Sequence, residues 1–249
     1  MYQIEMHDVS IDFVEAWKEA IKHLFLKGRE AIKWLKCDLT PPIVEHISFR
    51  IGNQIFFVRL IDLDSNLDTP SNIEGLRMIS QKANGIACYM PMRRKSIGWE
   101  VFLSDWGLVD AFNYQETNPF DLVTDEKIIM TDWEVQDFAV QFCKNHLEKK
   151  LGFTITSSQG NPEVSPSIWY NDNNDTGAII VLSNRYGKKN LSDFHSITIF
   201  KKQIMLVTKN LHIIKVELCN PNQKRNREVL PLYRGHATEI SSSDFELIG

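Results

Sequence analysis

The sequence predicts an α+β protein, with an N-terminal lobe of helix and β-hairpin and a C-terminal lobe built on a mixed sheet. Three patterns lead to this prediction. Apolar residues recur at helical spacing over 10–37. Two alternating segments, 43–51 and 54–62, flank a Gly-Asn pair, which is typical of a β-hairpin. A second helical pattern, over 131–151, is followed by several short strand-like segments.

The first helix is predicted to begin at Ser10, whose side chain suits an N-cap. Gly28 interrupts the helical pattern and is expected to kink the helix, and Pro41 and Pro42 are expected to end it. The expected buried residues of this helix keep to one face; they are Phe13, Trp17, Ile21, Leu24, Ala31 and Leu35.

The rest of the first lobe is predicted as a helix over 72–84 and strands over 86–92 and 96–103. Asp, Asn, Pro and Gly are frequent over 105–125, which is typical of a long ordered loop. We expect this loop to separate the two lobes. The predicted domains are residues 1–125 and 126–249.

The second lobe is predicted to start with a capped helix. Thr131 and Glu134 form the T-x-x-E pattern of a capping box, and Gly152 is a natural C-terminal stop. The expected buried stripe of this helix is Val135, Phe138, Phe142 and Leu147. Strands are predicted over 153–158, 167–170, 178–186 and 211–218, with a final strand and tail over 234–249. Residues 191–206 fit a helix and a strand equally well.

Composition favours a globular protein. The chain has 249 residues, of which 24% are charged, and its formal net charge is -4, whereas a strongly basic nucleic-acid binder would be positive. No apolar run has the length of a membrane span, and residues 1–10 carry no basic, apolar leader. We therefore expect a cytoplasmic protein with no membrane partner. Several short basic clusters leave open a nucleic acid or another protein as its partner.

Signatures of the common metal and cofactor sites are absent from the sequence. Acidic residues alternate over 62–68 like the start of a calcium loop, but Leu67 and Ile73 stand where that loop needs Gly and Glu. No two histidines, and no cysteine pair, have metal-binding spacing, and P-loop and dinucleotide signatures are missing. We expect no metal and no cofactor on these grounds. His236, beside Tyr233 and Gly235, is the histidine we count as a candidate binding residue.

The order of elements over 131–220 resembles the αβββαβ, restriction-endonuclease-like core of the PD-(D/E)XK nuclease superfamily. In those nucleases the second strand begins with a metal-binding Asp, and the third carries a Glu or Asp followed two residues later by a Lys. Here Ser167 falls near the Asp position, Ser183 at the second carboxylate position and Arg185 at the Lys position. Two hydroxyls do not replace two anionic ligands of a hard dication, so the resemblance implies a degenerate site.

Five segments resemble an uncharacterised group of bacterial proteins. They are residues 83–92, 122–128, 130–134, 166–169 and 231–236. This resemblance implies a bacterial origin and no particular activity.

Two functions follow from the residues. The first is a non-catalytic binding or interaction protein on a degenerate nuclease-like fold, with Arg185, Ser183, Ser167 and His236 as binding candidates. Arg185 stands out because a strand arginine has to reach a carboxylate, the open end of the sheet or a bound anion. The alternative is a divalent-metal-dependent nuclease, using magnesium, with relocated acids. The acids available for it are Glu134, Asp137 and Glu163.

Overall fold

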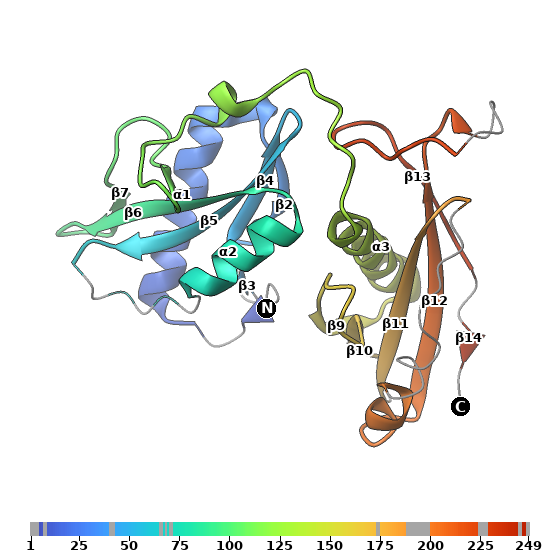
Figure 1. Ribbon diagram of the computed structural model, residues 1–249. Coiled ribbons are helices and arrows are strands. Elements are labelled where there is room, and N and C mark those ends of the chain that lie inside the picture. Colours follow the sequence, from blue (N-terminus) through green and yellow to red (C-terminus); the bar gives the residue numbers. More distant parts are fainter. Residues whose placement is uncertain are drawn as a thin grey trace. The chain divides into compact units, whose positions relative to one another are not determined.

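The computed structural model describes residues 5–6, 9–39, 43–64, 67, 69, 72–172, 175–187, 200–223, 229–243 and 246–247 (Figure 1). It confirms the predicted α+β class. The chain forms two units, residues 1–127 and 128–249, which are described in turn.

The first unit is a mixed sheet with one helix on each face (Figure 1). The strand order is β2-β4-β5-β6-β7, and β8 also pairs with β6. A two-stranded sheet pairs β1 with β3. The strands are β1 Glu5–Met6, β2 Lys33–Lys36, β3 Ile43–Val44, β4 Ile47–Ile51, β5 Gln54–Asp62, β6 Ile86–Arg94, β7 Trp99–Val101 and β8 Val109–Asp110. The helices are α1 Ile11–Gly28 and α2 Ile73–Lys82.

Helix α1 begins as predicted but ends nine residues early. The Ser10 hydroxyl accepts a hydrogen bond from the Phe13 amide at 3.1 Å and so caps the helix. The prediction that it continues to residue 37 is wrong, because Arg29 has a φ of 45° and turns the chain out of the helix. After a 3-10 turn at Arg29–Ala31, the next residues form β2 beside β4. The proline pair expected to end the helix lies outside the described residues.

The predicted hairpin is confirmed, with Gly52 at a φ of 55° in its turn. Helix α2 is confirmed within two residues, and the Asn72 side chain caps it by accepting from the Gly75 amide at 2.7 Å. It connects β5 to β6, which pair in parallel. The segment 105–125, predicted as a long ordered loop, also contains regular secondary structure, namely β8 and the 3-10 turn Pro119–Leu122.

The second unit packs helix α3 against a sheet of order β13-β12-β11-β10-β9, and β14 also pairs with β12. Strands β9, β10 and β11 form an antiparallel meander, and β12 joins β11 in parallel. The elements are α3 Asp132–His146, the π-helical turn Leu147–Leu151, β9 Thr154–Ser158, β10 Ile168–Asn171, β11 Thr176–Arg185, β12 Asn210–Cys219, β13 Glu239–Ser242 and β14 Glu246–Leu247. These strands lie within the predicted segments or overlap them closely. Residues 200–204 are helical, and the rest of the undecided segment, 191–199, lies outside the described residues.

The core of the second unit corrects one predicted residue. The Ile179 and Val181 side chains on β11 pack against the α3 side of the sheet, and Ile180 packs with Ile204 on the other side. Leu147 is buried as predicted, and Phe142 is partly buried. Phe138, however, is 42% exposed. The buried stripe of α3 follows Val135, Ala139, Val140 and Cys143, so Phe138 lies at its edge.

Candidate functional site

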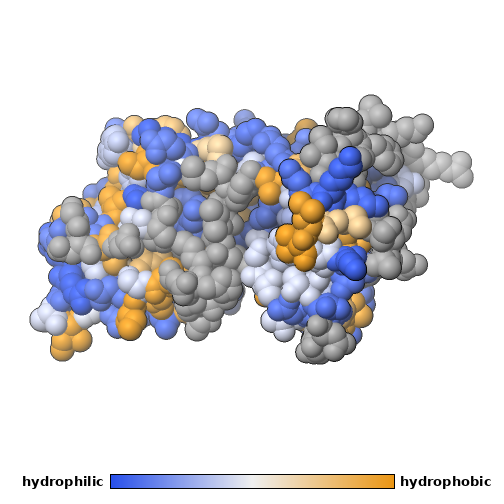
Figure 2. All heavy atoms as spheres, turned by 90° about the horizontal axis from the view of Figure 1, so that it is seen from below, coloured by the Kyte–Doolittle hydropathy of each residue, from blue (hydrophilic) through white to orange (hydrophobic). Residues whose placement is uncertain are grey.

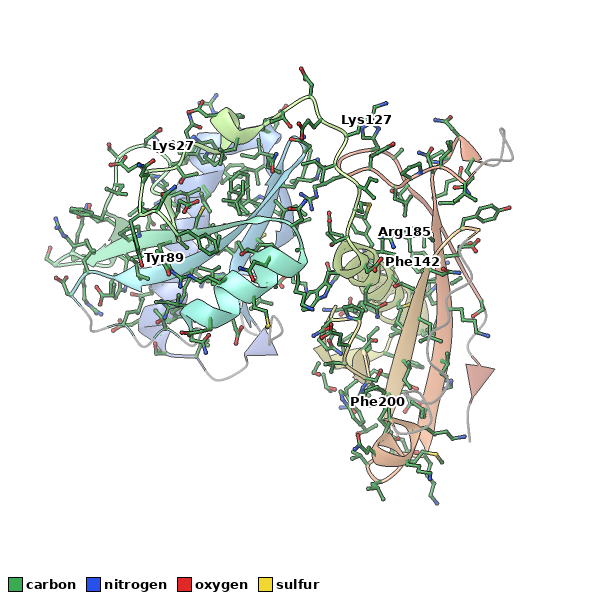
Figure 3. All side chains as sticks on the ribbon, in the orientation of Figure 1. Lys27, Tyr89, Lys127, Phe142, Arg185 and Phe200 are labelled. Carbon is green, nitrogen blue, oxygen red and sulfur yellow. The ribbon has the colours of Figure 1, made fainter. Side chains whose placement is uncertain are left out.

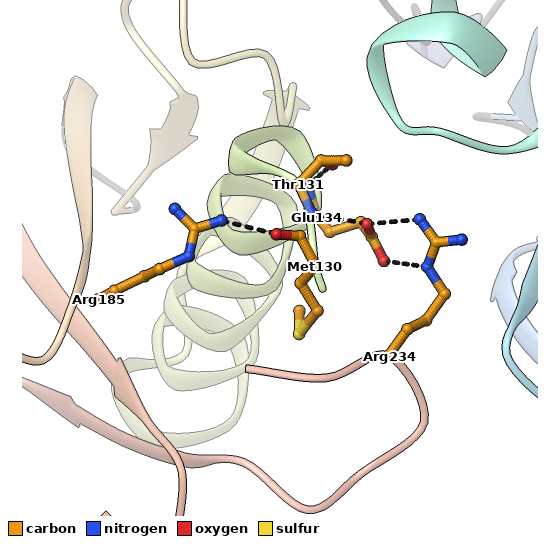
Figure 4. A network of polar contacts seen from close by, with 5 residues as sticks. All are labelled: Met130, Thr131, Glu134, Arg185 and Arg234. Carbon is orange, nitrogen blue, oxygen red and sulfur yellow. Dashed lines mark hydrogen bonds and ion pairs between the residues drawn. The ribbon is translucent and has the colours of Figure 1, made fainter. Parts of the chain in front are cut away.

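Two of the polar side chains singled out from the sequence, Arg185 and Glu134, lie at the N-terminal end of α3 (Figure 4). The Arg185 side chain, from the last residue of β11, reaches this end of the helix. Its Nη2 donates to the Met130 carbonyl at 2.8 Å, and its Nη1 forms an ion pair with Asp132. The alternation of β11 had placed Arg185 on this face, and the helix supplies the carboxylate that such an arginine requires.

Glu134 belongs to a buried ion pair on the other side of the same helix end (Figure 4). Arg234 donates to it through both Nε and Nη2, each at 2.7 Å, and only 4% of Arg234 and 8% of Glu134 are exposed. Glu134 also accepts from the Thr131 amide at 2.8 Å, which completes the predicted capping box. The planar guanidinium of Arg234 and the planar carboxylate of Glu134 therefore form a bidentate ion pair.

The charges of this helix end balance. Arg185 and Arg234 are matched by Asp132 and Glu134, and the first turn of α3 itself favours negative charge. Arg234 is a residue that the sequence did not single out. Its partner is 100 positions away, and no local pattern signals such a pair.

Ser167 does not join this cluster but lies inside the second unit. It is 1% exposed, and its hydroxyl oxygen accepts from the Val181 amide at 3.2 Å and lies 3.4 Å from Gln136 Nε2. The same Gln136 nitrogen donates to the Val181 carbonyl at 2.9 Å. The position that resembles the metal-binding Asp of a nuclease is therefore filled by a neutral hydrogen-bonded network. Gln136, which the sequence also did not single out, closes it.

The remaining candidates are dispersed. A Cβ built on Gly160 would lie 2.4 Å from Asp137 Oδ1, so Asp137 is packed against that loop. Glu163 is exposed in the same loop, where its amide donates to Asn161 Oδ1 at 2.7 Å. Among the described residues, no three His, Cys, Asp or Glu side chains lie close enough to hold a metal ion.

Ser183 and His236 are close in sequence to Arg185 and Arg234, respectively. Ser183 is half-buried on β11, two residues before Arg185 and on the same side of the strand. His236 is exposed, its amide donates to the Tyr233 carbonyl at 3.1 Å, and the two rings lie 5.7 Å apart. Figure 3 shows Arg185, at the end of β11, beside α3.

Comparison with known proteins gives one match. Residues 133–248 match the model of a family described as a domain of unknown function, DUF8840. This match falls within the second unit. No curated protein and no solved structure gives a significant match. None of the helices in the described part of the chain is both long enough and apolar enough to cross a lipid bilayer.

Proposed function

We propose that the second unit is a non-catalytic binding or interaction module built on a nuclease-like core. Its order of elements supports this. Helix α3 precedes the β9-β10-β11 meander, and β12 returns parallel to β11, with residues 200–204 helical between them. This is the order that the resemblance to the PD-(D/E)XK nucleases implies.

The observation that carries the proposal is the network around Ser167. A nuclease of this kind needs anionic ligands where the second and third strands meet, because carboxylates hold the divalent ion. Here the Ser167 hydroxyl is used by the Val181 amide and lies beside Gln136. Ser183, at the other carboxylate position, is a second neutral hydroxyl. A site of this composition binds neither magnesium nor manganese tightly.

The binding surface we propose is the end of β11 next to α3. Ligands of open α/β sheets favour the carboxyl ends of parallel strands, and Arg185 ends β11 on the parallel pair. Its partner Asp132 has a largely exposed side chain, so a phosphate or carboxylate of a ligand can replace Asp132 as the anion bound to Arg185. Ser183 and the exposed His236 supply further polar contacts for a nucleic acid or protein partner.

A protein partner of the second unit is favoured by a separate feature, which lies at the Thr176 end of β11, opposite to the Arg185 end. The turn after the 200–204 helix exposes three consecutive apolar residues, Met205, Leu206 and Val207. Figure 2 shows hydrophobic residues at the surface of both units among mostly hydrophilic ones. Contiguous exposed apolar groups are typical of surfaces that contact another protein.

The alternative is a metal-dependent nuclease with relocated acids. The acids available to it are Glu134, Asp137 and Glu163. Glu134 is held by Arg234 and by the helix cap, so its use as a metal ligand requires the buried ion pair to open. Asp137 packs against the loop that contains Gly160, and Glu163 is exposed in that loop. The cost of freeing Glu134 makes this alternative the weaker of the two.

A cleavage assay separates the two proposals. We expect the purified protein, given magnesium or manganese, to leave end-labelled DNA and RNA intact. The Ser167 hydroxyl is held by the Val181 amide, and among the described residues no three His, Cys, Asp or Glu side chains lie close enough to hold a metal ion. The matched controls are Glu163→Ala and Glu134→Gln, and the second keeps a helix-capping side chain. Cleavage that a chelator abolishes and that either variant loses would establish the nuclease instead.

A further inference from the structure

A row of polar side chains crosses the sheet of the first unit. The register pairs Ile47 with Val58, so His46, just before β4, lies next to Arg59 on β5. Arg59 in turn lies opposite Tyr89 on β6. Side chains that lie opposite each other in a sheet point to the same face and are about 5 Å apart. His46, Arg59 and Tyr89 therefore form one continuous row over three neighbouring strands.

This row is on the α2 face of the sheet. The alternate residues Ile47, Val58 and Cys88 belong to the core under α1, so the row points the other way. Helix α2 packs on β5 and β6 and adds a second guanidinium, Arg77, which interacts electrostatically with Tyr89. Figure 3 shows Tyr89 over the β5–β6 part of the sheet.

Several polar atoms of the row and of Arg77 are buried and have no hydrogen-bond partner among the residues that the structure describes. His46 is 1% and Tyr89 4% exposed. In the described part of the chain, both ring nitrogens of His46, the Tyr89 hydroxyl and Arg77 Nε have no hydrogen-bond partner. Buried polar groups in proteins are nearly always paired, and the exceptions call for an explanation such as a missing ligand. Three such side chains along one sheet face, beside half-buried Arg59, make a site rather than an isolated defect.

The protonation states favour an anion. Burial, together with the charge of Arg59, lowers the pKa of His46 to about 3, so its ring is neutral near pH 7. Burial raises the pKa of Tyr89, so its hydroxyl stays a donor. Arg59 and Arg77 carry two positive charges, while Glu74, exposed at the start of α2, supplies one negative charge nearby.

Two aromatic side chains cover the group from the loop after β8. The Tyr114 ring stacks with Tyr89 at 6.3 Å, and the Phe112 ring lies 5.2 Å from the Arg77 guanidinium carbon. Both rings are at least half exposed. A 3.1 Å hydrogen bond from Arg77 Nη2 to the Ala111 carbonyl also orients the guanidinium. Arg77 Nε has no hydrogen-bond partner among the described residues.

We propose that the first unit binds a small oxoanion, the phosphate or carboxylate group of a small molecule, against Tyr89 and between Arg59 and Arg77. The Tyr89 hydroxyl donates to the anion, the two guanidiniums neutralise it, and His46 gives a further hydrogen bond on the Arg59 side. All the residues named for this site belong to the first unit.

The test is isothermal titration calorimetry of the full chain with sodium phosphate and with sodium acetate, against sodium chloride at matched ionic strength. We expect saturable binding of at least one oxoanion, and the stronger of the two identifies the natural group as phosphate or carboxylate. Tyr89→Phe removes only the hydroxyl and is expected to weaken binding at least five-fold. It should keep or raise the melting temperature of the free protein, because an unpaired buried hydroxyl is lost. Arg77→Gln should weaken binding at least ten-fold.

Arg93→Gln, at an exposed arginine near the end of β6, is the matched control for Arg77→Gln and should bind like the wild type. The melting temperature and near-UV circular dichroism of each variant establish that it is folded. The proposal is overturned if neither phosphate nor acetate binds saturably. It is equally overturned if Tyr89→Phe and Arg77→Gln, both folded, bind with unchanged affinity.

Discussion

Arg234 is a buried charged side chain, and Glu134 accepts hydrogen bonds from its Nε and Nη2. Removing a charge pair from water costs several kcal/mol per ion, so well-aligned hydrogen bonds between the two ions have to offset that cost. The two 2.7 Å hydrogen bonds from Arg234 to Glu134 offset this cost. The Thr131 amide donates a further hydrogen bond to Glu134 Oε2, the oxygen that also accepts from Arg234 Nη2. The pair therefore joins the segment around residue 234 to the first turn of α3.

Arg234→Met is expected to lower the free energy of unfolding by about 3–5 kcal/mol, because it leaves the buried Glu134 carboxylate without its positively charged partner. Adding Glu134→Gln removes that charge while keeping a capping side chain, so the double variant should recover part of the loss. Urea denaturation of the full chain measures both. Lys22→Ala, in the exposed pair with Glu19, should cost below about 1 kcal/mol. A loss that small for Arg234→Met would show that the pair contributes little.

Individual residues were predictable where the reason is local. The alternation of β11 placed Arg185 on the face of Val181, a carboxylate was one of the partners expected for it, and the capping box indicated the role of Glu134. The partners Asp132 and Arg234 were not predictable, because both contacts join segments far apart in the sequence. Nothing in a single sequence encodes which distant side chain meets a buried charge.

Elements were predictable where one periodicity holds throughout. The hairpin, α2 and α3 each combine a clear period with a capping or turn residue. Helix α1 was predicted too long because its apolar spacing continues past Gly28 into β2, and a four-residue edge strand is too short to show its own period. The row of His46, Arg59 and Tyr89 was missed for another reason. It depends on which strands become neighbours, and the parallel pairing of β5 with β6 is set by packing of α2.

The way α3 and the π-helical turn after it face the sheet gives a prediction for two apolar residues, Phe138 in α3 and Leu147 in the turn. Leu147 is fully buried, so Leu147→Ala should lower the free energy of unfolding by about 2–5 kcal/mol through lost transfer energy and a cavity. Phe138→Ala should cost about 1 kcal/mol or less, because the ring is 42% exposed. Urea denaturation compares the two variants. A larger loss for Phe138→Ala than for Leu147→Ala would mean that α3 presents a different face to the sheet.

At the scale of the whole molecule, the chain has separate hydrophobic cores. One core lies between α1 and the first sheet, and another lies between α3 and the second sheet. The family match begins at residue 133 and ends at 248, which nearly coincides with the second unit, 128–249. A segment that recurs as a family of its own and carries its own core is expected to fold by itself.

We therefore expect a fragment of residues 128–249 to fold without the first unit. It contains α3, the whole second sheet, the Glu134–Arg234 pair and the bond from the Met130 amide to the Leu232 carbonyl, so none of these contacts is cut. The fragment should give a dispersed amide NMR spectrum and a cooperative urea transition. Leu147→Ala should shift that transition as it does in the full chain, and a fragment of 1–127 carrying α1 and the first sheet is the matched control. If fragment 128–249 shows collapsed amide dispersion and no cooperative transition while 1–127 folds, the second unit depends on the first, and the family match marks a module that needs its neighbour to fold.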